Sequence, residues 1–275
     1  MMEPESNGLP VSDLRFSAES VFGELKKLEI VDANVSIGGR TISFEGDLET
    51  PEDILSAMDR FGISRAVVYH RLAFENHPTV GNGLLMEKVA GQERLIPQWV
   101  LLPDSTDEFP PSYELAIQLH EERARCVRVA PRSHGYPFTP WCCGDLFEML
   151  ASERIPVFIS LDEVEWEGLH KILSDFSGLN VVLTDVGYRI GRSIYPLLRR
   201  FPNLFMEYTG FVIHWGLEEL CRQVGPERFL FGSGLGRDSP GPPLTTLALA
   251  AISVRSKQLI AGDNLLRILD LEDND

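Results

Sequence analysis

Residues 28–39 read LEIVDANVSIGG, an apolar run that changes into alternating polar and apolar residues before a pair of glycines. Short, nearly continuous apolar runs are typical of parallel strands that are buried on both faces. We expect a strand over Glu29–Ala33, with Asp32, Asn34 and Ser36 at or just beyond its carboxyl end. Because successive side chains of a strand point to opposite faces, these three polar side chains are predicted to share one face.

The same order, an apolar run and then an amphipathic segment, recurs along the rest of the chain. Thr50 and Pro51 are typical of a helix start, and Gly62 is typical of a helix end. The predicted strands are Glu29–Ala33, Arg65–Tyr69, Ile96–Leu102, Cys126–Ala130, Pro156–Leu161, Asn180–Thr184, Leu204–Tyr208 and Arg228–Gly232. The predicted helices are Ser17–Lys27, Pro51–Phe61, Gly83–Ala90, Ser112–Glu122, Asp145–Glu153, Glu163–Phe176, Ser193–Phe201, His214–Val224, Leu244–Ser256 and Asn264–Leu269.

Eight predicted strands that alternate with helices indicate an α/β fold, a single-domain (β/α)8 TIM barrel over residues 28–275. The length of 275 residues agrees with this fold, since such barrels typically have about 250 residues. Residues 1–27 are expected to form an N-terminal extension that is partly disordered. A doubly wound open sheet is the alternative architecture.

The composition excludes several classes of partner. The formal net charge is −16, from 41 acidic and 25 basic side chains, which argues against nucleic acid or an anionic membrane. No apolar run reaches about 18 residues, and the first residues, MMEPESNGLP, lack the features of a secretory signal. The four cysteines form no CxxC motif, which indicates free thiols and a cytoplasmic location.

In a TIM barrel the active site lies at the carboxyl ends of the strands. Arg128 is the candidate for binding a substrate anion, because a guanidinium on a central strand needs a carboxylate or a ligand anion. Asp185 is the candidate general base and His70 the candidate acid. The predicted catalytic residues are Asp185, His70 and Glu207, and the predicted substrate-binding residues are Arg128, Asn34, Ser36, Ser160, Asp32 and Ser233.

Ion pairs are the structural alternative for these charged side chains. Asp32 or Glu207 could be buried against Arg128, and Asp185 could pair with Arg189 or Arg192.

Several segments, in order and over nearly the whole chain, carry a resemblance to a known family. They include IVDANVSIG, ILSAMDRFGISRAVVYH, CVRVAP, NVVLTDVG, FPNLFMEYTG, GPERFLFGSG and AGDNLLRIL. Residues 28–269 thereby resemble the amidohydrolase-related group of the metal-dependent hydrolase superfamily. The resemblance implies a barrel enzyme that binds one or two divalent metal ions through histidines and an aspartate, and activates water. It also implies a homo-oligomer.

The metal ligands of that family are replaced at the matching positions of this sequence. Asn34 and Ser36 stand where the first-strand histidines are expected, Ser160 and Asp185 match two further histidines, and Gly234 matches the aspartate. Neutral amide and hydroxyl groups are weak metal ligands, and glycine has no side chain. We therefore expect no metal and no other cofactor. A Mg²⁺ or Ca²⁺ site with oxygen ligands from Asp32, Asp185 and Glu207 is the alternative.

Two functions follow from these residues. The first is a hydrolase that cleaves a C–N, ester, lactone or related C–C bond of a small anionic substrate without the usual metal. The second is a pseudoenzyme that has kept the fold and serves as a ligand-binding or regulatory protein, since a fold alone does not determine function.

Overall fold

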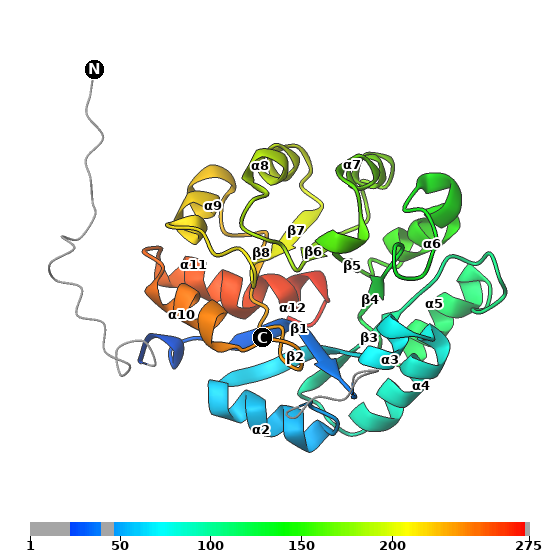
Figure 1. The fold of residues 1–275 in the computed structure, drawn as a ribbon, viewed down its shortest axis with the longest axis horizontal. Helices are drawn as coiled ribbons and strands as arrows, with labels where there is room; N and C mark the ends of the chain where they lie inside the picture. Colours follow the sequence, from blue (N-terminus) through cyan, green and yellow to red (C-terminus); the bar gives the residue numbers. More distant parts are fainter. Residues whose placement is uncertain (1–22, 40–46, 273–275) are drawn as a thin grey trace, which may run out of the picture.

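The computed structural model describes residues 23–39 and 47–272, and within them eight parallel strands form one sheet in sequential order. Two hydrogen bonds connect its edges: the Ala33 amide donates to the Phe231 carbonyl at 2.9 Å, and the Ser36 amide donates to the Leu235 carbonyl at 3.0 Å. The sheet thus closes into a barrel with the helices around it (Figure 1). The predicted TIM barrel is confirmed, and the doubly wound alternative is wrong.

The elements have the following bounds. The strands are β1 (Ile30–Ile37), β2 (Ile63–His70), β3 (Leu95–Val100), β4 (Cys126–Val129), β5 (Val157–Ser160), β6 (Val181–Thr184), β7 (Leu204–Glu207) and β8 (Phe229–Leu230). The helices are α2 (Pro51–Phe61), α3 (Arg71–Glu75), α4 (Pro78–Val89), α5 (Ser112–Glu121), α6 (Pro140–Ser152), α7 (Trp166–Asp175), α8 (Gly191–Arg200), α9 (Gly216–Val224), α10 (Gly241–Leu249), α11 (Val254–Gln258) and α12 (Asn264–Ile268). Two short helical segments are η2 (Leu161–Glu163) and η3 (Leu259–Asp263).

Helix α2 has the bounds that the sequence predicts, because both of its ends are fixed by local chemistry. The Thr50 hydroxyl accepts a hydrogen bond from the Asp53 amide, and the Asp53 carboxylate accepts one from the Thr50 amide. This is a capping box at the first turn. At the other end Gly62 adopts the left-handed conformation, with φ of 72°.

Strand β1 is longer than predicted, and its alternation is interrupted. It continues to Ile37, and its pairing with β2 shifts register between Asp32 and Val35. Ala33 belongs to the apolar cluster inside the barrel, whereas Val35 belongs to the cluster under the helices. An extra residue in a strand reverses the faces beyond it. The prediction that Asp32 shares a face with Asn34 and Ser36 is therefore wrong.

Several predicted helices also differ from the structure: α6 begins five residues before the predicted Asp145, and α7 begins at Trp166, not at the predicted Glu163. The segment predicted as Leu244–Ser256 contains two helices, α10 and α11, because the backbone leaves the helical region at Ala250 and the Ser253 hydroxyl caps a new helix. The segment predicted as Gly83–Ala90 belongs to the longer helix α4. The predicted helix Ser17–Lys27 and the proposed N-terminal extension lie mostly outside the described residues.

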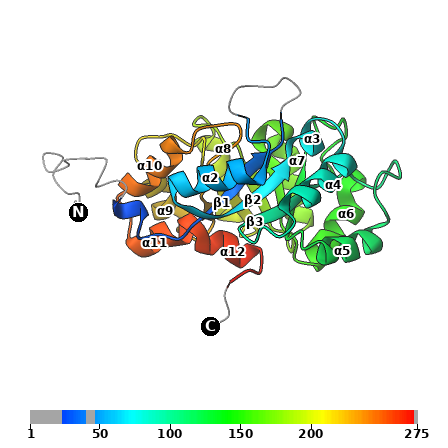
Figure 2. The ribbon, with the colours of Figure 1, turned by 90° about the horizontal axis from the view of Figure 1, so that it is seen from below.

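Helix α12 closes the end of the barrel opposite the predicted site, where it lies across the amino-terminal ends of the strands (Figure 2). Its side chains Leu265, Leu266 and Ile268 pack against strand residues that point into the barrel, such as Val31 and Phe158. The site therefore has an apolar floor.

No helix within the described ranges is both long and apolar enough to cross a membrane. All four cysteines are free, as predicted from their spacing.

Candidate active site

Arg128 is at the centre of a hydrogen-bonded network inside the barrel. It lies on β4, only 1% exposed, and its guanidinium is 4.4 Å from the centre of the Tyr69 ring. Its Nε donates to Gln98 Oε1 at 2.8 Å, its Nη1 to Thr184 Oγ1 at 3.3 Å, and its Nη2 to Asn34 Oδ1 at 2.9 Å. Strands β1, β2, β3 and β6 thus hold this guanidinium in one orientation.

Asn34 connects Arg128 to two carboxylates. Its amide nitrogen donates to Asp185 Oδ1 at 3.2 Å and to Glu207 Oε2 at 3.4 Å, while its amide oxygen accepts from Arg128. Both the nitrogen and the oxygen of the side-chain amide are hydrogen-bonded, so the cation on one side and the carboxylates on the other set its orientation. This connects β1, β4, β6 and β7 at the mouth of the barrel.

Asp185 follows β6 and is held by an ion pair. Its backbone has φ of 56°, a left-handed conformation that is uncommon outside glycine, although Asp adopts it more readily than most residues. Its carboxylate accepts a hydrogen bond from Thr184 Oγ1 at 3.0 Å and pairs with Arg237. Burial alone would raise the pKa of Asp185, but the charges of Arg237 and Arg128 outweigh burial and lower it.

The pKa of Glu207 is shifted in the opposite direction to that of Asp185. Its side chain is fully buried, and burial together with the nearby charges of Asp185 and Asp32 raises its pKa to about 7. Its Oε1 accepts hydrogen bonds from the amide and hydroxyl of Thr209, which partly offset this rise. Asp185 therefore gives up its proton more readily than an ordinary carboxyl group, and Glu207 holds its proton more tightly.

Asp32 and Ser233 connect β1 to the loop that follows β8. Asp32 Oδ1 accepts from the Ser233 amide at 2.9 Å and from the Asn34 amide at 3.0 Å. Ser233 Oγ in turn accepts from the Leu235 amide at 2.9 Å. Burial raises the pKa of Asp32 to about 6, against the hydrogen bonds from Ser233 and Asn34 that lower it. These two residues position the strand that carries Asn34.

The other predicted residues lie at the same end of the barrel, outside this network. His70 caps helix α3, where its Nδ1 accepts from the Leu72 amide at 3.2 Å, and burial lowers its pKa. Ser160 ends β5, opposite Thr184 in the sheet register. Ser36 is buried on β1. Among the described residues, no hydrogen bond or ion pair joins these three side chains to Asp185 or Glu207.

The sequence places the groups that complete the network at the mouth of the barrel, after predicted strands, but assigns them no role. Gln98, Thr184 and Tyr69 hold Arg128, and Arg237 pairs with Asp185 in place of the expected Arg189 or Arg192. The available signal was position, since all four follow or end predicted strands. In the described part of the chain Arg128 contacts neutral acceptors and forms no ion pair, so the alternative in which Asp32 or Glu207 pairs with it is wrong.

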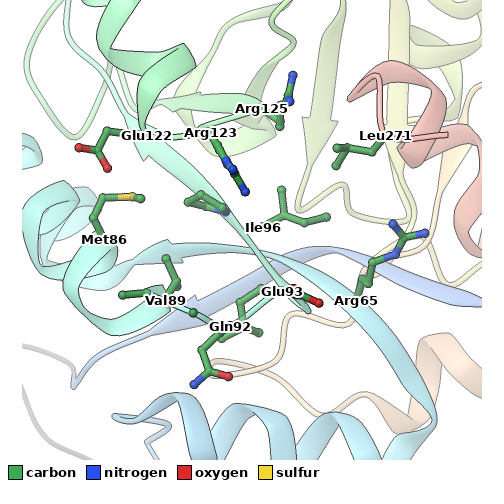
Figure 3. Close-up of a pocket in the computed structure, with 14 residues that line it drawn as sticks. Arg65, Met86, Val89, Gln92, Glu93, Ile96, Glu122, Arg123, Arg125 and Leu271 are labelled. Atoms are coloured by element: carbon green, nitrogen blue, oxygen red, sulfur yellow. The ribbon is translucent and has the colours of Figure 1, made fainter. Parts of the chain in front are cut away.

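A cavity of about 510 Å³ opens at the opposite end of the barrel (Figure 3). Its lining includes Arg65, Ile96, Arg123 and Arg125, near the beginnings of β2, β3 and β4, together with Leu271. None of the predicted site residues lines it. It is therefore separate from the network around Arg128.

Buried ionisable groups at the carboxyl ends of the strands occupy the place where TIM-barrel enzymes have their active sites. The chain belongs to the amidohydrolase family, whose model matches residues 43–271. The matched part begins after β1, so it does not include Asn34 and Ser36. No curated protein sequence matches the chain.

Solved structures of low sequence identity have the same fold. A 5-carboxyvanillate decarboxylase from Sphingomonas paucimobilis has 14% identity and a TM-score of 0.67, covering 88% of this chain and 99% of its own. A 2,6-dihydroxybenzoate decarboxylase from Rhizobium has 12% identity and a TM-score of 0.71, covering 89% and 99%. A dihydroxybenzoic acid decarboxylase from Polaromonas sp. JS666, with bound manganese and the inhibitor 2-nitroresorcinol, has 13% identity and a TM-score of 0.69, covering 89% and 97%.

The residues around Arg128 do not fit a divalent metal ion such as the manganese of the Polaromonas enzyme. Among the residues that the structure describes, no three His, Cys, Asp or Glu side chains are placed to hold a metal. The Asn34 amide oxygen, a potential ligand, already accepts a hydrogen bond from a guanidinium. Divalent ions are held by several carboxylate, imidazole or thiolate groups, and a neighbouring cation opposes them.

Proposed function

We propose that this chain is an amidohydrolase-family enzyme that cleaves a C–N, ester, lactone or C–C bond in a small anionic substrate without a divalent metal. One observation carries the proposal: a single amide, Asn34, is hydrogen-bonded to one carboxylate whose pKa is lowered and to another whose pKa is raised. Neighbouring groups with diverging pKa values are typical of general acid–base pairs. The aromatic acid decarboxylases of the same fold support a C–C bond as the target.

The exposed edge of the network indicates where a substrate would bind. The Asp185 side chain is 13% exposed and the Arg237 side chain 35% exposed, whereas Arg128 and Glu207 are buried. In this proposal Arg237 binds the substrate anion in place of the predicted Arg128, which is buried, and Asp185 accepts a proton from the substrate or from water. Glu207 supplies a proton in its neutral form. The acid role passes from His70 to Glu207, because Glu207 and Asp185 accept from the same Asn34 amide, whereas the described hydrogen bonds do not join His70 to Asp185.

A turnover assay on chelator-treated protein tests this proposal. The panel contains small carboxylates that bear an amide, an ester or a lactone, and hydroxybenzoates for the C–C reaction. We expect turnover that EDTA does not abolish. Replacing Asp185 by Asn or Glu207 by Gln should lower kcat by about 10²–10⁴-fold, the usual contribution of general acid–base catalysis. The matched control is Glu165→Gln, whose carboxylate lies on the surface and pairs with Arg132.

Two results would contradict parts of the proposal. Turnover that EDTA abolishes and Mn²⁺ restores would contradict the metal-free reaction. Saturable ligand binding with no turnover of any compound would favour the alternative, a binding protein. The homo-oligomer stays a prediction, which light scattering of the purified chain tests.

A further inference from the structure

The guanidinium of Arg128 is a buried charge without a direct counterion. Its hydrogen-bond acceptors are an amide, a hydroxyl and a second amide, all neutral, on Gln98, Thr184 and Asn34. In the described ranges, no carboxylate lies within ion-pair distance of it. A charge taken out of water is destabilising unless hydrogen bonds and nearby opposite charge compensate for it. The protein therefore holds a positive charge here that has not been cancelled by an adjacent anion.

The compensating negative charge lies one group further away. Asn34 connects Arg128 to Asp185 and Glu207, and Thr184 connects Arg128 to Asp185 by a second route. The charge of Arg128 also lowers the pKa of Asp185, which lies beyond these two neutral side chains. The result is one fixed cation surrounded by side chains from four strands, with anions in the outer layer.

The position of this cation is significant because Asn34 and Asp185 match metal-ligand positions in the family resemblance. A divalent ion bound between these residues would lie beside the guanidinium, and the Asn34 oxygen it needs already accepts from Arg128 at 2.9 Å. Two like charges separated by a few ångströms in a buried site repel strongly. The guanidinium and a metal ion are thus mutually exclusive at this place.

We infer that Arg128 replaces the metal: its guanidinium, fixed by Gln98, Thr184, Asn34 and the Tyr69 ring, is the permanent cation at the centre of this barrel. The cation that this site holds is therefore a planar organic group, the guanidinium of an arginine of the chain itself. The inference goes beyond the proposed function and does not depend on turnover. It applies equally to an enzyme and to a binding protein of this fold.

Chemical rescue tests the inference without a substrate. Arg128→Ala leaves a polar space that fits a free guanidinium ion, and thermal unfolding is measured with guanidinium, ammonium or sodium chloride at equal ionic strength. Guanidinium at about 20 mM is too dilute to denature, given slopes of a few kcal/mol per molar. We expect it to raise the unfolding midpoint of Arg128→Ala by about 2–4 °C in a saturable way, and ammonium and sodium to have no such effect. Arg132→Ala, whose arginine is exposed and pairs with Glu165, is the matched control and should show no rescue.

The second measurement uses the unmodified chain and covers the case in which Arg128→Ala does not fold. Protein purified from Mn²⁺- and Zn²⁺-supplemented cultures is analysed for metal by mass spectrometry, and its unfolding midpoint is measured with each ion. We expect well under one metal ion per chain and an unchanged midpoint. One tightly held ion per chain with Arg128 in place would overturn the inference. So would a folded Arg128→Ala protein that guanidinium does not stabilise. Absence of turnover in the assay above would contradict only the proposed function.

Discussion

At the scale of single residues, the two carboxyl groups next to Asn34 differ because their surroundings differ. Asp185 reaches the edge of the network and has Arg237 as a direct partner, whereas Glu207 is fully buried and faces Asp185 and Asp32. The partner lowers one pKa, and burial beside like charges raises the other. Two carboxyl groups next to the same amide thereby have pKa values shifted in opposite directions.

The raised pKa of Glu207 predicts how stability depends on pH. Because the folded state holds this proton more tightly than the unfolded state, the stabilisation is complete below the unfolded pKa near 4.5 and is lost as the pH rises through about 7. A rise from 4.5 to about 7 corresponds to an effect on the order of 3 kcal/mol at most. Glu207→Gln, which carries no titrating proton, should remove this part of the slope between pH 5 and 8 in urea unfolding.

Two comparisons make this prediction specific to Glu207. Glu165→Gln, an exposed variant, should keep the slope of the unmodified chain. Asp32, whose pKa is raised to about 6, contributes in the same direction and is retained in both variants, so some slope persists. Identical slopes for Glu207→Gln and the unmodified chain would contradict the raised pKa.

Gly232 is expected to be required for the position of Glu207. A Cβ at residue 232 would lie 2.5 Å from Cγ and Cδ of Glu207, closer than real contacts allow. Gly232→Ala should therefore displace the carboxyl group, lower the free energy of unfolding by about 1–3 kcal/mol and reduce any turnover. Gly83→Ala is the control, because Gly83 lies in α4 with open space around it and alanine favours a helix by up to about 1 kcal/mol. Equal stability of the two variants would contradict the close contact at Gly232.

At the scale of elements, the sequence predicts what local chemistry determines. The bounds of α2 follow from Thr50, Pro51 and Gly62, all of which are close in sequence to the ends they fix. The extension of β1 and its shifted register depend on pairing with β2, which no local pattern encodes. The break between α10 and α11 had a signal in Ser253, a typical N-cap residue that the continuous apolar stripe obscured.

For the site, too, the sequence predicts positions but not the contacts that depend on the folded chain. Barrel topology places strand ends together, so Asn34, Arg128, Asp185 and Glu207 could be selected from their positions after predicted strands. The pairing of Asp185 with Arg237 could not be predicted, because it depends on the left-handed backbone of Asp185 and on the loop after β8. The same applies to the arrangement of neutral groups around Arg128.

Asn82 holds helix α4 to the end of β3 and should contribute strongly to stability. Its side chain is buried, donates to the Val100 carbonyl at 2.8 Å and accepts from the Val100 amide at 2.9 Å. Asn82→Ala leaves two backbone groups without partners, which should lower the free energy of unfolding by about 2–4 kcal/mol in urea. Asn76→Ala, on an exposed residue between α3 and α4, should change it by less than about 0.5 kcal/mol. A loss of that small size for Asn82→Ala would contradict its bridging role.

At the scale of the whole molecule, the two halves of the barrel interior differ in polarity. The carboxyl half contains the polar network around Arg128, and the amino half contains an apolar cluster that α12 completes. Segments near opposite ends of the chain meet in this cluster, since Val31 of β1 and Leu265 of α12 both belong to it. The polar half therefore rests on packing that forms only when the C-terminal helix is in place.

Truncating one buried side chain of α12 should consequently destabilise the entire barrel. Leu265 is 1% exposed, and Leu265→Ala should lower the free energy of unfolding by about 2–5 kcal/mol, as for other buried leucines. Val254→Ala on α11, at a residue 59% exposed, should change it by less than about 0.5 kcal/mol. Amide exchange locates the effect: faster exchange in β1, β4 and β7 as well as in α12 is expected, because the strands around Arg128 share the floor that α12 provides. Exchange that increases only within α12 would show that the helix is an independent appendage and that the polar half is stable without it.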